Sequence, residues 1–310
     1  KHERPLLVIV GELQMSTRTL LTLMTATLDI ELTAVFTAVS CALLGAVLVL
    51  RKMTMVGDAI SHAVLPGIAV AYWLSQSRAS LWMFLGAASV GVLATIIIEL
   101  LRKKLKVQSD ASIGMTFTTL FALGVILITF WSDSVDLDQE CVLYGEIAYV
   151  PFNTWSFGDL NMGPIALWSS GLLLLAVLTY TFTGFKGLKM SSFNEDYAAV
   201  LGIGVAAWNL SLMAMVSFAT VVSFESVGAI LVVALLVVPA ATAYLLVEKL
   251  YHLLLGAAAI ALLAALGGYG CSRWLDTSIA GTIATLLGVQ FLAALVYHQF
   301  IQKRNQYAVV

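Results

Sequence analysis

The chain has 310 residues, of which 60% are hydrophobic and only 11% are charged, and its mean hydropathy is +0.96. In a soluble domain roughly a quarter of the residues are charged, so a soluble fold of this length would leave much apolar surface in water. The net charge of −2 offers no basic surface to a nucleic-acid partner. The composition predicts an all-α, polytopic membrane helix bundle.

Apolar blocks of membrane-spanning length follow one another along the chain. A bilayer core needs about 20 apolar residues in a helix. This criterion predicts nine spans, with eight or ten as alternatives because Gly and Pro interrupt several blocks. Residues 1–28 then form an N-terminal segment without an assigned role, 29–300 one membrane domain and 301–310 a tail. The blocks lie roughly at 29–50, 57–75, 81–101, 111–131, 163–183, 206–223, 226–247, 252–271 and 278–300.

Basic residues are concentrated in alternate connections between these spans. The positive-inside rule assigns such connections to the cytoplasm. The C-terminus and the tail 301–310 are then cytoplasmic, and the connection 132–162, which carries an acidic stretch, lies outside. The basic residues are Arg51, Lys52, Arg102, Lys103, Lys104, Lys106, Lys186, Lys189, Lys249, Lys303 and Arg304, and the acidic stretch comprises Asp133, Asp136, Asp138 and Glu140.

The sequence lacks the motifs of a membrane enzyme or a nucleotide-binding protein. It has no GxxxxGK[ST] phosphate loop and no HExxH or GxSxG motif. Its three cysteines, Cys41, Cys141 and Cys271, form no CxxC pair, and the two that lie in or beside apolar blocks are interpreted as small hydrophobic residues. We therefore expect neither enzymatic activity nor a tightly bound cofactor.

An aspartate and a histidine stand four residues apart at the start of the second span, within Met55–Gly67. On a helix Asp58 and His62 share one face, with side chains about 5–6 Å apart. One ionisable group inside a span costs roughly 2.5–3.5 kcal/mol. Two on one face, with Ser61 beside them, therefore favour a polar pathway. Carboxylate and imidazole together suit borderline divalent ions such as Mn, Fe or Zn.

Other residues of the same segment bear on this hypothesis. Pro66 lacks the N–H that would bond the carbonyl of His62, so we expect a helix break and a free carbonyl there. Gly57 and Gly67 allow neighbouring helices to approach closely. In the structural alternative, Asp58 caps the start of the helix and His62 hydrogen-bonds a neighbouring helix.

A short helix is predicted near 194–202, on the cytoplasmic side. Ser192 with Glu195 fits a capping box, or Asn194 is the cap, and Gly202 is a natural stop. About two turns are too short to be stable alone, so the helix is a candidate for docking into a groove of another protein. An ordinary surface turn is the alternative.

Two glutamates remain near the ends of spans. Glu225 lies where a span meets the outside, and is either a solvated interfacial residue or part of a pathway. Ser61 and Pro66 are, with Glu225, further candidates for that pathway. Glu99 precedes the basic run 102–106 by one turn and is predicted to form an ion pair with it.

Three runs of residues, in this order, carry a resemblance to a known family. They are MVGDAISHAVLPGIAVAY from Met55, FNEDYAAVLGIG from Phe193 and VGAILVVALLVVPAATA from Val227. Over roughly 29–300 the chain resembles the permease subunits of bacterial manganese, zinc and iron importers of the ATP-binding-cassette class. Residues 1–14 do not resemble the family.

The resemblance implies a fold akin to the vitamin B12-type permease, placed in the bacterial cytoplasmic (inner) membrane. It implies import of a divalent metal, Mn, Zn or Fe, that an extracytoplasmic metal-binding protein delivers and two ATPase subunits drive. The run Val135–Gly145 also resembles members that work with a second, paralogous permease, and the pathway is formed by a homodimer or a heterodimer. By motif position Asp58 and His62 contact the metal, and the coupling helix seated on the ATPase contributes Asn194, Glu195, Asp196, Tyr197, Ala198, Leu201 and Gly202.

Two other functions are compatible with the residues. A secondary cation transporter, driven by a proton or sodium gradient, would need no ATPase. A permease for chelated iron or a cobalamin-like ligand would need a wide, aromatic-lined cavity, whereas Asp58 and His62 suit a bare ion.

Overall fold

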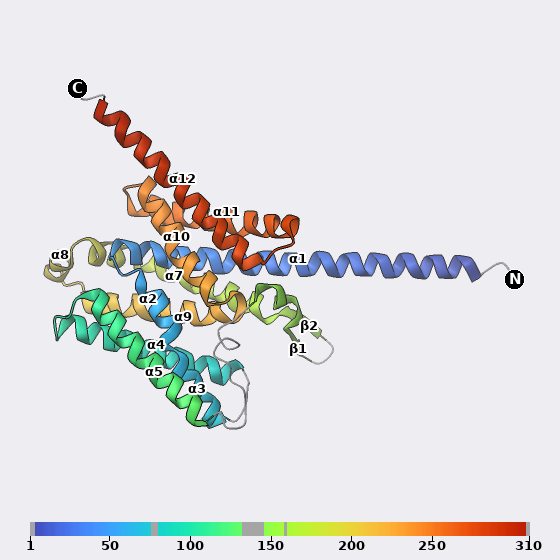
Figure 1. The fold of residues 1–310 in the computed structure, drawn as a ribbon, viewed down its shortest axis with the longest axis horizontal. Coiled ribbons are helices and arrows are strands. Elements are labelled where there is room, and N and C mark those ends of the chain that lie inside the picture. The colour runs from blue at the N-terminus through green and yellow to red at the C-terminus, as the bar shows by residue number, and fades with distance from the viewer. Residues whose placement is uncertain (1–3, 76–79, 132–145, 158–159, 308–310) are drawn as a thin grey trace.

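The computed structural model describes residues 4–75, 80–131, 146–157 and 160–307, which form a bundle of long helices (Figure 1). The prediction of an all-α membrane bundle is confirmed, although a 3₁₀-helix, η1, and a small hairpin follow the helix that ends at Trp131. The elements are α1 (Arg4–Leu50), α2 (Met55–Ala63), α3 (Leu65–Ser75), α4 (Ser80–Lys103), α5 (Ser109–Trp131), η1 (Ile147–Phe152), β1 (Thr154–Phe157), β2 (Leu160–Pro164), α7 (Ile165–Phe193), α8 (Glu195–Val200), α9 (Val205–Val227), α10 (Ala229–Leu246), α11 (Leu250–Leu275) and α12 (Ile279–Tyr307).

Nine helical segments of the described part are long and apolar enough to cross a membrane, which agrees with the predicted number. The first apolar span begins at Met24 rather than at residue 29, and α1 itself begins at Arg4. Neither glycine nor proline occurs between Glu12 and Leu44 to interrupt the helix. The N-terminal segment and the first span therefore share one helix.

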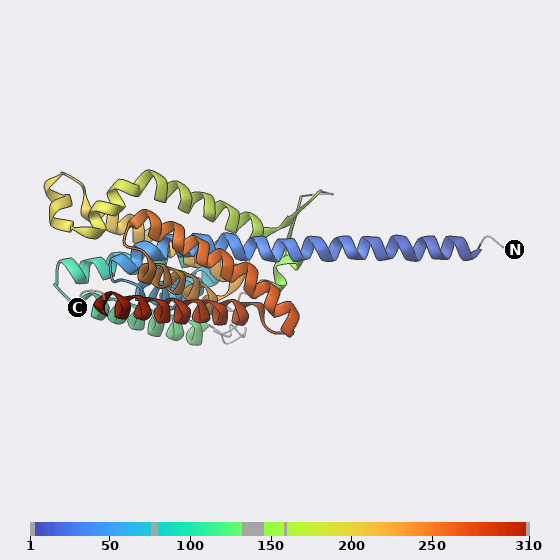
Figure 2. The same cartoon turned by 90° about the horizontal axis from the view of Figure 1, so that it is seen from above.

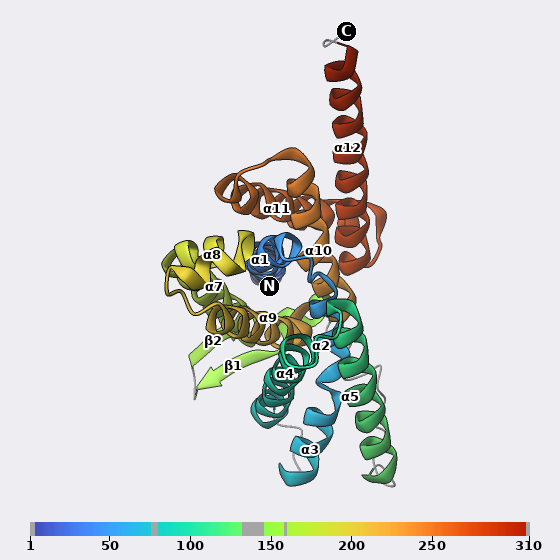
Figure 3. The ribbon, with the colours of Figure 1, turned by 90° about the vertical axis from the view of Figure 1, so that its left-hand side faces the viewer.

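Helix α1 occupies the centre of the bundle. It packs against α7, α9, α10 and α11, which surround it in the view along the axis (Figure 3). Helices α3, α4 and α5 form a second group to one side, and α12 packs against α10 and α11. The short helix α2 joins the two groups, because it contacts α4 and α5 as well as α9 and α10. Residues on α2 therefore lie at the boundary between the groups.

The two ends of the bundle differ. Helix α8 lies at the tip of one end, here called the α8 end, and the antiparallel β1–β2 hairpin lies at the other, the hairpin end (Figure 1). Seen from above, α1 runs along the bundle between α7 on one side and α12 on the other (Figure 2). Arg51 after α1, and Arg102 and Lys103 in the last turn of α4, belong to the α8 end. The first two predicted basic connections thus lie at one end of the molecule.

The turn between α1 and α2 is closed by backbone hydrogen bonds in a Schellman motif. The N–H of Met53 donates to the carbonyl of Leu48 (3.0 Å), and that of Lys52 donates to the carbonyl of Val49 (3.1 Å). Lys52 takes the left-handed conformation, with φ of 56°, where glycine is usual. Met53 and Leu48 are both buried in the core, and an apolar pair at these two positions often accompanies the motif. The start of α2 is thereby fixed to the end of α1.

Helices α1 and α10 touch backbone to backbone at Gly45. A Cβ at this position would overlap the carbonyl oxygen of Leu236 on α10. The Leu236 side chain also lies against Gly57 of α2, 3.3 Å from the place of an added Cβ. Gly67 and Gly86 make a backbone contact between α3 and α4. The predicted close approach of helices at Gly57 and Gly67 is therefore confirmed.

Gly45→Ala should destabilise the purified protein by about 1–3 kcal/mol, the usual cost of overpacking a core. Gly114→Ala is the matched control, because a Cβ at Gly114 on α5 meets no atom within 4 Å. Alanine there should be neutral or slightly stabilising, through its higher helix propensity. Thermal unfolding of both variants in detergent measures the difference, and equal melting temperatures would contradict the backbone contact.

Candidate functional site

The second span is broken into α2 and α3 at Val64, two residues before Pro66. The break is as predicted, because proline has no N–H to continue the helical ladder. The N–H of Val64 donates to the carbonyl of Ile60 (3.2 Å), and the free carbonyl at His62 stays a prediction. Gly124 of α5 packs against the break, where an added Cβ would lie 2.9 Å from Pro66.

Asp58 and His62 lie on the same face of α2, as predicted. Nε2 of His62 is 3.8 Å from Oδ1 of Asp58. In the single chain the side chain of Asp58 is 45% exposed and that of His62 is 40% exposed, although the span Met55–Ser75 that carries them is largely buried. The pair therefore opens onto a surface of the chain and not into its core.

Aromatic side chains of α5 border this surface. The ring centroid of His62 lies 6.0 Å from that of Phe117 and 5.7 Å from that of Phe121, the latter in an edge-to-face arrangement. Phe117, Phe121 and Gly124 are spaced by four and three residues, so they share one face of α5. The imidazole therefore stands between its own helix and α5, with the Asp58 carboxylate beside it.

Asp58 does not cap its helix, so this part of the structural alternative is wrong. The N-cap of α2 is Thr54, whose side chain makes no capping hydrogen bond. Asp58 stands in the first turn, where a negative charge is favoured by the helix dipole. Ser61 is buried and donates to the backbone carbonyl of Asp58, and Pro66 is buried as well. Their roles in a pathway stay predictions.

The pair offers only part of a metal coordination sphere. Among the described residues there is no group of three or more His, Cys, Asp or Glu side chains that could hold a metal. A first-row divalent ion usually takes four or more ligands. Within the described part of the chain, Asp58 and His62 are thus two candidate ligands, fewer than such an ion usually takes.

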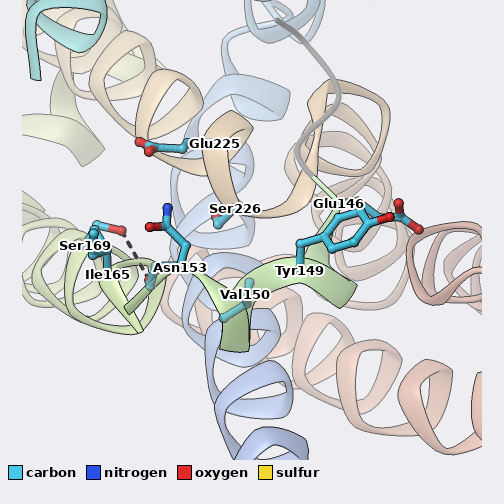
Figure 4. A pocket seen from close by; sticks show the side chains of 9 residues that line it. Glu146, Tyr149, Val150, Asn153, Ile165, Ser169, Glu225 and Ser226 are labelled. Carbon is cyan, nitrogen blue, oxygen red and sulfur yellow. Dashed lines mark hydrogen bonds between the residues drawn. The ribbon is translucent and has the colours of Figure 1, made fainter. Parts of the chain in front are cut away.

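Glu225 lies at the hairpin end, beside a cavity of about 180 Å³ between α7, α9 and η1. Figure 4 shows its carboxylate on α9, with the amide of Asn153 facing the same space. Glu225 is exposed, as expected of a solvated residue at the end of a span, and its role in a pathway stays a prediction. The cavity is lined by Glu146, Tyr149, Val150, Asn153, Ile165, Ala166, Ser169, Glu225 and Ser226.

The short helix α8 is bounded by Asn194 and Gly202. Oδ1 of Asn194 accepts a hydrogen bond from the N–H of Tyr197 (2.9 Å), so Asn194 is the cap. The capping box at Ser192 is wrong, because Ser192 lies in the last turn of α7, where its hydroxyl accepts from Nε of Arg51. Gly202 takes the left-handed conformation, with φ of 77°, and ends the helix in a second Schellman motif.

Apolar side chains of α8 face away from the bundle. Ala198 is fully buried, whereas Tyr197 is 58% and Val200 is 85% exposed. Phe193 before the helix and Leu201 after it are also exposed. Apolar side chains gathered at an exposed tip are typical of a surface that binds another protein.

Glu99 is the ion-pair partner of the basic run, as predicted. Its carboxylate lies 3.1 Å from the guanidinium of Arg102 and 2.7 Å from Nζ of Lys103. Cys41 is buried and Cys271 is exposed. The predicted external acidic stretch and Cys141 fall in the segment 132–145, which lies outside the described residues.

The sequence matches the family described as "ABC 3 transport family" over residues 24–298. The chain belongs to this family. One relative is the manganese transport system membrane protein MntD of Bacillus subtilis (strain 168), 44% identical over 265 residues, which cover 86% of this chain and 90% of that protein. Another is the zinc transport system membrane protein TroD of Treponema pallidum (strain Nichols), 41% identical over 271 residues, which cover 87% of this chain and 73% of that protein.

A solved structure shares the fold of this ABC 3 family member. PsaBC from Streptococcus pneumoniae in complex with Fab superposes with a TM-score of 0.68 at 30% sequence identity, over 86% of this chain and 89% of that chain. The predicted family is therefore confirmed, and so is the predicted class of polytopic transport permease.

Sequence reasoning misses three features of this ABC 3 permease. Phe117 and Phe121 could be assigned to one face of α5 by their spacing, but nothing in the sequence pairs them with His62. Arg51 is recognisable only as a basic residue at a span end. Val200 belongs by sequence to the candidate docking helix, but the sequence does not tell that its side chain is 85% exposed.

Asn194→Ala should loosen α8 by about 1 kcal/mol, because the N–H of Tyr197 loses its acceptor. Backbone amides of 195–200 should then exchange with deuterium roughly fivefold faster in the intact protein. Asn194→Asp keeps an acceptor oxygen at the cap and should retain normal protection. Unchanged exchange in the alanine variant would show that the cap does not hold the helix.

Proposed function

We propose that this chain is the membrane-spanning permease subunit of an ATP-driven importer that moves a divalent transition metal ion into the cytoplasm. The proposal is carried by one observation: a carboxylate and an imidazole, 3.8 Å apart and each about half exposed, stand on a helix inside a membrane span. It is supported by the family and by relatives whose names assign them to manganese and zinc transport.

The environment of the pair follows from the cost of charge in lipid. A charged side chain facing hydrocarbon costs roughly 2.5–3.5 kcal/mol on insertion scales. The open face of Asp58 and His62 is therefore assigned to a water-filled pathway at the seam with a second permease, either a copy of this chain or a paralogue. A second carboxylate and imidazole across the seam would complete four ligands. Such a site is divided between two subunits and can open to release its ion.

Helix α8 is the proposed contact with the ATPase. Buried Ala198 holds one side of the helix on the bundle, and exposed Tyr197 and Val200 present the other side to a groove in the partner. Asn194, Glu195, Asp196, Leu201 and Gly202 belong to the same coupling segment. A dimer of permeases would engage two ATPase subunits, one at each α8 helix.

The transport cycle is proposed to be one of alternating access. An extracytoplasmic metal-binding protein docks at the hairpin end and releases the ion above the seam. Binding of ATP to the two ATPase subunits displaces both α8 helices, and the spans then rock around the pair on α2. The α8 end and the C-terminus face the cytoplasm, in accord with the positive-inside rule, and the membrane is the bacterial inner membrane. The side chains of Asp58 and His62 admit Mn, Zn and Fe alike.

Asp58→Ala or His62→Ala should lower metal uptake at least about tenfold, because each removes one of few ligands. Radioactive manganese or zinc accumulation by cells measures this, with assembly verified by co-purification of the ATPase. His252→Ala is the matched control, since His252 is exposed at the start of α11. Wild-type uptake by both assembled α2 variants would remove the site.

The source of energy is tested separately. In vesicles that contain the purified complex, uptake should require ATP on the α8 side. Uptake driven by a proton or sodium gradient without ATP would instead establish a secondary transporter.

Val200→Asp should weaken binding of the ATPase on the order of tenfold or more, because a charge buried without a partner costs more than the 1.4 kcal/mol that makes a factor of ten. Leu105→Asp is the control: Leu105 is 69% exposed in the α4–α5 connection, at the same end of the bundle. The amount of ATPase retained by the immobilised permease at increasing ATPase concentrations gives the affinity. Equal retention by both variants would exclude α8 as the docking element.

A further inference from the structure

The side chain of Arg51, in the turn between α1 and α2, forms hydrogen bonds to α7 and to α9 at the α8 end. Its Nε donates to the hydroxyl of Ser192 (2.9 Å), one terminal nitrogen donates to Ser191 (2.7 Å) and the other to Oδ1 of Asn209. Ser191 and Ser192 are in the last turn of α7, and Asn209 is in the first turns of α9. We call this set of four residues the Arg51 clasp.

The clasp holds both helices that carry α8. Helix α7 ends at Phe193 and α9 begins at Val205, so α8 and its flanking turns are the only chain between the two. Ser191 and Asn209 are 1% and 2% exposed, so the acceptors of the clasp are fixed inside the bundle. A planar guanidinium with donors in a rigid fork sets the relative position of its acceptors, which a flexible ammonium group does not. A displacement of α8 therefore reaches Arg51 from two sides.

The backbone of Arg51 continues through the turn into α2, the helix that carries Asp58 and His62. Arg51 is the last residue before Lys52 in the Schellman motif that ties α2 to α1. The N–H of Val56, in the first turn of α2, bonds the carbonyl of Met53 (3.2 Å), which continues the hydrogen bonding from the turn into α2. Asp58 follows two residues later. The backbone between the guanidinium and the carboxylate thus contains a hydrogen-bonded turn and one helical turn, with no loose segment.

We infer that Arg51 is a positioning residue that couples movement of α8 to the Asp58–His62 pair on α2. It contacts neither metal nor nucleotide. Its effect is to make the ends of α7 and α9 and the start of α2 move as one body. This inference rests on the proposed function, because it concerns how the movement of α8 that the ATPase drives is linked to release of the ion.

The test uses the complete complex, with its ATPase and its metal-loaded binding protein, in sealed vesicles with manganese(II) as the probe. In Arg51→Ala, the number of manganese ions transported per ATP hydrolysed should fall about tenfold, within the usual range of coupling free energies between sites. The rate of ATP hydrolysis should be retained, and so should the concentration of loaded binding protein that half-saturates it. Arg51→Lys keeps the charge and part of the hydrogen bonding, so it should restore the ratio in part.

The control is Lys189→Ala, which removes an exposed positive charge from α7 near the clasp and should leave ions per ATP unchanged. A wild-type ratio in Arg51→Ala would overturn the inference. A parallel loss of hydrolysis and transport in an assembled complex would overturn it too, since that is the result of a merely structural role. If Arg51→Ala does not assemble, the ratio in Arg51→Lys decides in the same way. Failure of the proposed function is distinguishable, because wild-type complex would then move no manganese at the expense of ATP.

Discussion

Hydrocarbon offers no hydrogen-bond partner, and this constraint decides where each polar group of the chain stands. Many hydroxyls inside the spans donate back to their own helices, as Thr116 does to the carbonyl of Ser112 (2.8 Å) and Thr242 to that of Val238 (2.7 Å). Basic side chains gather at the ends of spans, and Glu99 is paired where it meets them. The half-exposed side chains of Asp58 and His62 on α2 depart from this pattern, and the proposed cation pathway would explain why they are there.

The proposed pathway would lie where α2 joins the two groups of helices. The helix lies between the group around α1 and the group of α3, α4 and α5, and it is short because the chain breaks at Val64. Its face towards α5 is bordered by Phe117 and Phe121. A ligand pair at the boundary of two helix groups can change its surroundings when the groups shift, without any change in the fold of either group.

Much of this arrangement is predictable from local pattern. Apolar blocks of sufficient length give the nine spans, the spacing of four residues places Asp58 with His62, and Asn194 and Gly202 mark the ends of α8. These predictions succeed because each depends on residues within one or two turns of each other. The beginning of α1 is predicted less well, since its polar first part continues a helix that contains no residue to stop it.

Contacts between distant segments are beyond such reasoning. Arg51 is 158 residues away from Asn209 along the chain, and no periodicity connects them. The same holds for the backbone contact of Gly45 with Leu236, where a glycine in an apolar block has many possible partners. Ser192 shows how a local rule fails: its sequence context fits a cap, but the residue lies in the last turn of α7 and accepts from the guanidinium of Arg51.

The turn between α1 and α2 has a consequence for how the chain enters the membrane. A side chain other than glycine at a left-handed position costs about 1–2 kcal/mol, and Lys52 occupies such a position. Glycine would relax the backbone there. It would also remove a cation from the carbonyl end of α1, where the helix dipole favours it, and from a connection whose positive charge helps to decide on which side it stays during insertion. The positive charge of Lys52 thus favours the correct orientation of the first two spans, at the cost of a strained backbone conformation at this residue.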